Sequence, residues 1–341
     1  MKNWVNNIIN LKIDDITKYK FPTDEYFGLE VLDNNAKYEF IIRLSSSNKG
    51  LLCLGSGVID QKTKSIPRFQ RYRWKDHFEE SLIYYFDPTL YLTDELQVGW
   101  CIGTKDDWYL EKISEIIKKI IHTSKIKEEH VLFYGTSAGG FVSAMLATMI
   151  KGSTAFVGNF QYSILKVHAK THLENMKKYC FEGLNNETIK SEYGYRIDLI
   201  EMFKKEKYVP PIIYYVNANS KVDILGQCVP FIKDLEKLDY SDNDIEIIIY
   251  HDENGHRSRV IYGEAYEFIQ MILKRKIYRY YNRSPVPNKK IIKINRENHA
   301  LKAELKKMKN EIDKLNEENK NLKNNNIKSK MSNYLRTCFK K

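Results

Sequence analysis

A glycine-flanked serine is the residue of this sequence best suited to nucleophilic chemistry. Ser137 lies in segment 135–139, which fits G-x-S-x-G, between an apolar run at 131–134 and a helical pattern at 141–150. In a tight strand-to-helix turn, strained backbone lifts the serine hydroxyl clear of the sheet, and flanking glycines avoid clashes. The backbone N–H of Ala138 would then face a developing oxyanion. A helix N-cap is the alternative, but it leaves both glycines unexplained, and a phosphate loop would need a following Gly-Lys-Ser/Thr.

A serine nucleophile needs a histidine to accept its proton and an acid to orient that histidine. Asp223 follows the strand-like run 211–216, and His256 follows the run 245–250. The chain order of serine, acid and histidine is the order found in α/β-hydrolase folds. We therefore predict that Ser137, Asp223 and His256 act together in catalysis.

Other acids and histidines compete for these two roles. Asp223 could instead cap the helix that follows it, while Asp234 is expected inside a helix and Asp252 beside the base loop. His251 ends its strand and is the rival of His256. The remaining histidines lack comparable placement and are expected to be surface or core residues: His77, His122, His130, His168, His172 and His299.

A second oxyanion donor is expected from the loop after an earlier strand. The run 51–54 ends in a glycine-flanked serine, which favours the backbone N–H of Ser56 or Gly57, although Gly-Ser-Gly is also an ordinary turn. Basic residues interleaved with aromatic ones follow this loop and could hold an anionic substrate or the phosphates of a donor, or form a solvated loop. They are Arg68, Arg71, Arg73 and Lys75.

The elements that must position these residues are short apolar strands alternating with amphipathic helices. This alternation predicts an α/β domain over residues 1–275, with a mostly parallel sheet flanked by helices and a small helical cap at 160–208. Strands are expected at 38–44, 51–54, 82–86, 97–102, 131–134, 153–157, 211–216 and 245–250, and helices at 113–121, 141–150, 229–238 and 262–275.

The C-terminal part of the chain has a different period. After a basic, tyrosine-rich linker at 276–288, residues 289–323 repeat apolar positions every seventh residue in two series offset by three, as in a coiled coil. Asn298 and Asn319 at a-type positions favour in-register pairing, so we expect a parallel homodimer. The basic amphipathic tail 324–341 could lie on an anionic membrane or be a frayed end. The two series are Ile294, Leu301, Met308, Leu315, Leu322 and Ile291, Asn298, Leu305, Ile312, Asn319.

The net charge of the 341-residue chain, +11, belongs to this C-terminal part. Residues 276–341 hold 19 Lys+Arg and 6 Asp+Glu, a net of +13, which leaves 55 − 19 = 36 basic and 44 − 6 = 38 acidic residues elsewhere. No base-stacking platform or recognition helix accompanies this charge, so we expect no nucleic-acid partner. An anionic membrane, or an anionic polymer near it, is the expected partner instead.

Composition and cysteine usage indicate an ordered cytoplasmic protein. A hydrophobic content of 43% excludes wholesale disorder, and no apolar run approaches the roughly 18 residues of a membrane-spanning helix. The N-terminus lacks the pattern of a signal peptide, and five scattered cysteines without CxxC fit reduced thiols. Peripheral association with the inner face of the cell membrane is compatible with this location. No zinc cluster or dinucleotide fingerprint is present, so we expect neither a metal nor a tightly bound cofactor.

The catalytic pattern resembles a known family. Ser137, Asp223 and His256, with Leu-Gly-Ser-Gly at 54–57 and the stretch ELQVGWCIGTKDDWY before the serine turn, look like the α/β-hydrolase-type O-acetyltransferases of bacterial capsular polysaccharide. A more distant similarity is to the acetyltransferase component of accessory secretion systems. The resemblance covers roughly residues 35–275. It implies acetyl transfer from acetyl-CoA, as co-substrate, to sugar hydroxyls of a surface polysaccharide. By this resemblance Ser137 would carry the acyl group, His256 would move protons and Asp223 would fix the imidazole.

Three functional interpretations follow. The first is a polysaccharide O-acetyltransferase, and the second is a carbohydrate esterase or other serine hydrolase with the same three residues. The third is a non-catalytic α/β domain that serves as a coiled-coil scaffold for an envelope assembly, and association with the membrane or with capsule assembly is a further expectation. Transferase and hydrolase share an acyl-enzyme, and the outcome depends on whether a sugar hydroxyl or water reaches it.

Overall fold

The computed structural model of the protein describes residues 1–47, 49–238, 245–257, 262–281, 301 and 304–312. The chain divides into two units, Met1–Tyr278 and Arg279–Lys341. Each unit is described by itself below.

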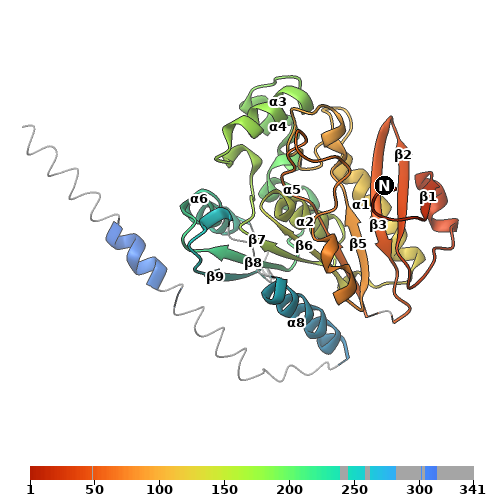
Figure 1. Ribbon diagram of the computed structural model, residues 1–341. Coiled ribbons are helices and arrows are strands. Elements are labelled where there is room, and N and C mark those ends of the chain that lie inside the picture. The colour runs from red at the N-terminus through yellow and green to blue at the C-terminus, as the bar shows by residue number, and fades with distance from the viewer. Residues whose placement is uncertain (48, 239–244, 258–261, 282–300, 302–303, 313–341) are drawn as a thin grey trace, which may run out of the picture. The chain divides into compact units, whose positions relative to one another are not determined.

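Within the described residues, the first unit is built on a nine-stranded sheet in the order β1-β2-β3-β5-β4-β6-β7-β8-β9 (Figure 1). The strands from β5 to β9 in this order are all parallel, whereas β3 is antiparallel to both of its neighbours and β1 is parallel to β2. The strands are Ile8–Leu11 (β1), Phe27–Asp33 (β2), Ala36–Arg43 (β3), Leu51–Leu54 (β4), Ser81–Tyr85 (β5), Val131–Thr136 (β6), Thr154–Gly158 (β7), Ile212–Asn217 (β8) and Ile245–Tyr250 (β9).

Helices cover both faces of this sheet, and strands covered on both faces are apolar along their whole length. In β6, Val131 and Phe133 join the core that includes α1 and α2, while Leu132 and Tyr134 join the opposite core under α8. The helices are Tyr109–Thr123 (α1), Ala138–Met149 (α2), Lys170–Cys180 (α3), Asn186–Ile197 (α4), Leu199–Glu206 (α5), Lys221–Asp223 (α6), Val229–Leu235 (α7) and Tyr262–Tyr281 (α8). A π-helical turn, η6 (Ile224–Cys228), joins α6 to α7.

The predicted fold class, a mostly parallel sheet flanked by helices, is confirmed. The predicted strand at 97–102 is wrong. Trp100 and Cys101 have positive φ angles of 50° and 56°, which lie outside the extended region of β-strands, and the N–H of Gly99 donates to the Asp87 carboxylate at 3.0 Å. This run is therefore a buried loop, and its apolar composition reflects packing in the core rather than strand pairing.

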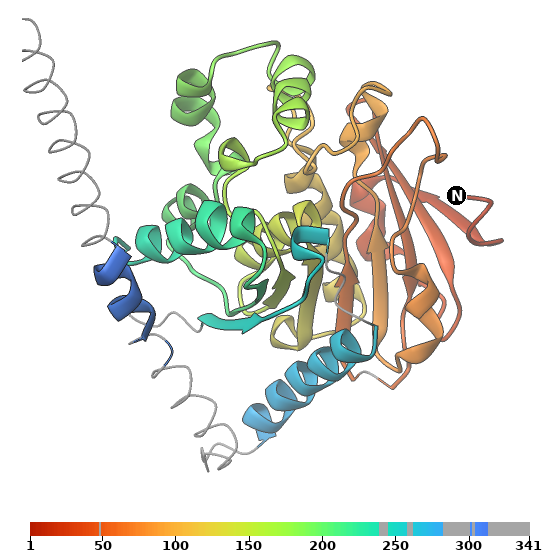
Figure 2. The same cartoon turned by 60° about the vertical axis from the view of Figure 1, so that its left-hand side comes forward.

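The segment predicted as the cap, 160–208, holds α3, α4 and α5. α5 packs against α2, and its Met202 and Phe203 are buried in the main core. α3 and α4, in light green in Figure 2, extend away from the body of the domain. The chain enters the cap after β7, which places it at the carboxyl ends of the parallel strands.

The C-terminal predictions are only partly within the described residues. α8 continues to Tyr281, six residues past its predicted end, because no proline or glycine interrupts the helix before the predicted linker reaches Pro285. In the second unit, residues 304–312 are helical. The remainder of the predicted coiled coil, apart from residue 301, and the predicted tail 324–341 lie outside the described residues. No helix in the described part of the chain has the length and apolar composition needed to cross a membrane.

Candidate active site

Ser137 occupies a strained turn between β6 and α2, with φ 53° and ψ −124°. Non-glycine residues rarely adopt this conformation, and it persists where surrounding structure imposes it. Here the N–H of Ser137 donates to the carbonyl of Gly158 at 2.9 Å, and its own carbonyl accepts from the N–H groups of Gly140 and Phe141. Backbone bonds on both sides of Ser137 therefore hold the turn.

The glycines beside Ser137 are required by close backbone contacts. A Cβ on Gly135 would lie 2.2 Å from the carbonyl oxygen of Gly139, across the turn. A Cβ on Gly139 would lie 3.2 Å from the carbonyl oxygen of Ser56, in the loop after β4. The first glycine lets the turn close, and the second lets the loop after β4 lie directly on the start of α2.

The structure brings Ser137, His256 and Asp223 together in one hydrogen-bonded chain. The Oγ of Ser137 is 3.2 Å from Nε2 of His256, and Nδ1 of His256 is 2.9 and 2.8 Å from the two carboxylate oxygens of Asp223. The Asp223 side chain is 3% exposed and the His256 side chain 27%. A buried acid thus orients a partly exposed imidazole toward the serine hydroxyl, the arrangement that activates a serine for attack on a carbonyl.

Asn217, which sequence reasoning did not identify, holds the acid loop to the base loop. This fully buried residue ends β8, and its amide nitrogen donates to the carbonyls of Asp252 and Gly255 at 2.8 and 2.9 Å. Its amide oxygen accepts from the N–H of Asp252 and of Asn219, both at 3.0 Å. Because Gly255 directly precedes His256, these bonds fix the backbone position from which the His256 side chain extends. The only sequence signal was an asparagine at a strand end.

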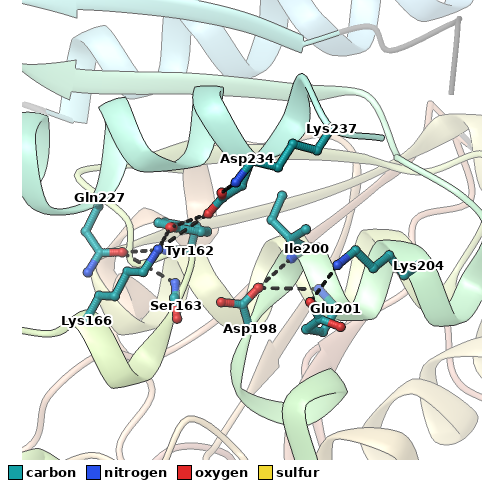
Figure 3. A network of polar contacts seen from close by, with 10 residues as sticks. All are labelled: Tyr162, Ser163, Lys166, Asp198, Ile200, Glu201, Lys204, Gln227, Asp234 and Lys237. Carbon is teal, nitrogen blue, oxygen red and sulfur yellow. Dashed lines mark hydrogen bonds and ion pairs between the residues drawn. The ribbon is translucent and has the colours of Figure 1, made fainter. Parts of the chain in front are cut away.

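A polar network fastens the helix of Asp223 to the start of the cap (Figure 3). Gln227, one turn after Asp223, accepts from the backbone N–H groups of Tyr162 and Ser163 at 3.0 and 3.4 Å. Farther along the helix, Asp234 accepts from the Tyr162 hydroxyl at 2.9 Å and pairs with lysines. Asp234, the competing acid, is therefore engaged away from His256.

The two predicted oxyanion loops meet at the serine turn. The N–H of Gly57 donates to the Gln70 side chain at 3.1 Å, which favours Ser56 over Gly57 as the predicted second donor. Among the loop and cap hydrogen bonds of the described residues, none is donated by the backbone N–H of Ser56 or of Ala138. Ser56 lies against the start of α2, as the contact with Gly139 shows. The N–H groups of Ser56 and Ala138 stay the predicted donors to an oxyanion.

The predicted basic residues do not gather at the serine. Of the four, only the Arg71 side chain contacts the turn, through Thr136. Lys75 lies over the rings of Tyr26 and Tyr72 at 5.0 and 5.3 Å, so its ammonium is committed elsewhere. Anion binding by Arg68, which is half-buried, and by Arg73, which is exposed, stays a prediction.

A second histidine, which the sequence analysis placed among surface or core residues, lies against the imidazole of His256. The ring of His168 meets the ring of His256 edge to face, with centroids 5.5 Å apart. His168 is exposed and precedes α3, so the segment that leads into α3 contacts His256 directly. Burial and the nearby His168 together lower the pKa of His172 on α3. No local sequence signal links these histidines to His256.

The described cysteines are poor alternatives to the serine as nucleophile. Cys53, Cys101, Cys180 and Cys228 are all buried and free. Burial raises the pKa of each thiol, that of Cys228 to about 12, which leaves little thiolate at neutral pH. In the same described part of the chain, no group of three or more His, Cys, Asp or Glu is placed to hold a metal ion.

Comparison with solved structures supports the fold at low sequence identity. The capsule O-acetyltransferase of Neisseria meningitidis serogroup A is 17% identical, with a TM-score of 0.54 over 71% of this chain and 93% of that one. A mutant of that enzyme in complex with CoA is 16% identical, with a TM-score of 0.54 over 71% of this chain and 94% of that one. The glycosylation-associated Gap123 complex of Streptococcus agalactiae is 13% identical, with a TM-score of 0.53 over 74% of this chain and 46% of that one. No protein-family model and no curated protein matches the sequence. These likenesses establish the α/β-hydrolase fold.

Proposed function

We propose that this protein is a serine-dependent acyltransferase that O-acetylates a bacterial capsular or surface polysaccharide from acetyl-CoA. The observation that carries the proposal is the hydrogen-bonded chain from Ser137 through His256 to Asp223, with Ser137 held in a strained turn. Support for the acetyl donor and the acceptor comes from the fold shared with the capsule O-acetyltransferase, one mutant of which is in complex with CoA.

The chemistry proceeds in two half-reactions. His256 takes the Ser137 proton as Oγ attacks the thioester carbonyl, and the N–H groups of Ala138 and Ser56 stabilise the oxyanion. The C–S bond breaks, and His256 returns the proton to the CoA thiolate, leaving acetyl-Ser137. His256 then takes the proton of a sugar hydroxyl as its oxygen attacks the acetyl group, and gives it back to Ser137 as the ester leaves. Asp223 keeps Nδ1 protonated and stabilises the imidazolium in both halves.

An esterase is the second candidate function, because the His256 side chain is 27% exposed and water can reach it. In that case the second half-reaction would use water in place of the sugar hydroxyl. The acyl-enzyme on Ser137 would be the same.

Labelled acetyl-CoA, with and without candidate capsular polysaccharides, tests the proposal. We expect acetyl-Ser137 in the mass spectrum and label in the polysaccharide, both lost in Ser137→Ala and retained in Ser65→Ala, which removes an exposed hydroxyl elsewhere. Transfer that survives Ser137→Ala overturns the mechanism. Acetyl-CoA or ester hydrolysis at a rate that no acceptor changes identifies an esterase. Absence of any acyl chemistry favours a non-catalytic scaffold.

We further propose that the second unit pairs with a second copy of the chain as a parallel coiled coil. In the helix 304–312, Leu305, Met308 and Ile312 follow the heptad and are 42%, 51% and 57% exposed, so the described single chain leaves this seam largely uncovered. The heptad in the printed sequence continues on both sides of this helix.

Light scattering on the full-length protein tests this pairing. Leu305→Glu with Met308→Glu should convert a dimer into a monomer, because two charges replace adjacent seam positions. The control pair Lys306→Glu with Asn310→Glu, off the seam, should leave the dimer intact. A monomeric unmodified chain, or a dimer that survives the seam variant, contradicts the pairing.

A further inference from the structure

We propose that Arg71 is a positioning residue that holds the second oxyanion donor, Ser56, in place against the nucleophile turn. The inference rests on the acyl-enzyme half of the proposed function. It replaces the sequence-based expectation that Arg71 binds an anionic substrate.

The Arg71 guanidinium joins the two loops that must supply the oxyanion donors. One of its terminal nitrogens donates to the carbonyl of Gly55 at 3.2 Å, and the other donates to Oγ1 of Thr136 at 2.6 Å. Gly55 directly precedes Ser56, and Thr136 directly precedes Ser137. One planar group therefore ties the residue before one predicted donor to the residue before the nucleophile.

The guanidinium is itself held in a fixed orientation. Its carbon lies over the ring of Tyr134 at 4.9 Å and over the ring of Trp74 at 5.8 Å, and these two rings stack on each other. Arg71 is also one of the few non-glycine residues with positive φ, at 65°. A planar cation that lies on aromatic faces and has two hydrogen-bonded nitrogens has little rotational freedom. It can therefore act as a rigid link between the two loops, which we call a strut.

The segment around Arg71 braces the same loop at further points. The hydroxyl of Ser56 donates to the carbonyl of Arg68 at 3.0 Å, and Gln70 accepts from the N–H of Gly57 and donates to the carbonyl of Val58, both at 3.1 Å. These bonds occupy the Ser56 hydroxyl and the Gly57 N–H. They leave the Ser56 N–H as the donor free to face the reacting carbonyl, and only Arg71 links this loop to the serine turn by a side chain among the residues described.

A charged strut and a phosphate-binding residue predict different kinetics. A strut acts on the oxyanion of any ester, whereas a phosphate-binding residue matters only for a donor that carries phosphates. Acetyl-CoA and p-nitrophenyl acetate, which has no phosphate, therefore separate the two roles. Loss of one oxyanion donor costs about 10²- to 10³-fold in kcat, and a displaced donor should cost about 10- to 100-fold.

The test compares Arg71→Met and Arg71→Lys with Lys64→Met, which removes an exposed charge from a nearby loop. Acetyl-Ser137 formation would be followed with both donors. We expect Arg71→Met to lower the acylation rate about 10- to 100-fold with either donor while KM changes less than about threefold. Arg71→Lys should recover only part of the loss, because an ammonium is a point charge and cannot span both acceptors, and Lys64→Met should match the unmodified protein. A fourth variant, Arg71→Ala, tests rescue. Guanidinium at concentrations that do not unfold the protein should restore part of its acylation rate.

A raised KM for acetyl-CoA with unchanged p-nitrophenyl acetate turnover would overturn the strut and assign Arg71 to donor binding. Unchanged kinetics with both donors would overturn it as well. A loss of rate with a matching fall in Tm and no guanidinium rescue would indicate a purely structural role. If Ser137→Ala acylates like the unmodified protein, the proposed function fails instead, so the two failures are distinguishable.

Discussion

The two sides of the candidate site are held by different means. On the nucleophile side, Ser137 is fixed by backbone bonds to Gly158, Gly140 and Phe141 and by glycines without room for a side chain. On the base side, His256 lies in a three-residue 3-10 turn and is positioned by the side chains of Asp223 and Asn217. Backbone geometry makes the first side rigid, whereas the second depends on polar side chains that single substitutions can remove.

The largest expected effect comes from a substitution that disturbs the backbone turn around Ser137. Gly135→Ala places a Cβ 2.2 Å from the Gly139 carbonyl, so the turn cannot close and Ser137 is displaced. We expect at least a 10³-fold loss of acylation and a lower Tm, measured by acetyl-Ser137 formation and thermal unfolding. Gly263→Ala is the matched control, because nothing lies within 4 Å of its Cβ and alanine favours a helix. An active Gly135→Ala would refute the rigid turn.

An intermediate effect is expected from breaking the side-chain support of the base. Asn217→Ala leaves the carbonyls of Asp252 and Gly255 and the N–H groups of Asp252 and Asn219 without their buried partner. We expect the free energy of unfolding in urea to fall by about 1–3 kcal/mol. We also expect kcat to fall about 10- to 100-fold, because the backbone of His256 is no longer held in place. Asn254→Ala, an exposed residue of the same loop, should change both quantities far less. Equal effects of the two variants would count against this role.

The smallest effect should be a pH dependence of stability that originates beside the base. Burial and His168 lower the pKa of His172 below its ordinary 6.5. As pH falls through about 6.5, His172 is therefore protonated in the unfolded chain before it is protonated in the folded chain. The His172 contribution therefore destabilises the fold as pH falls below about 6.5 toward the lowered pKa. His172→Gln should lose less Tm than the unmodified protein between pH of about 7.5 and about 5.5. His122→Gln, at an exposed position on α1, is the control and should lose as much Tm on acidification as the unmodified protein. The same loss of Tm in His172→Gln would contradict the assignment.

The sequence is informative where function requires a backbone pattern. The serine turn could be predicted because the glycine spacing, the preceding strand and the following helix are all local. Asp223 and His256 could be placed because parallel strands end at one edge of the sheet, so residues that follow β8 and β9 are brought near Ser137. The fold class follows from the same alternation of strands and helices.

The remaining features depend on contacts between distant segments. Nothing near position 168 signals that His168 will meet His256, and nothing near position 71 signals a bond to Thr136. Residues 97–102 show how burial imitates a strand, because their apolar side chains pack in the core while Asp87 holds the backbone as a loop. Strands β1 and β2 were not predicted, since their residues lie within a compositionally mixed N-terminal region.

The contact between Gly139 and Ser56 also bears on how remote relatives can be found. It brings two loops more than 80 positions apart in the sequence into backbone contact. A bulky residue in place of Gly139 is therefore unfavourable as long as the loop after β4 keeps its position. A search that required both a glycine-flanked serine after an early strand and the G-x-S-x-G turn, at variable separation, would demand this coupling directly. Such a paired pattern should detect diverged chains at identities where whole-length comparison of sequences finds none.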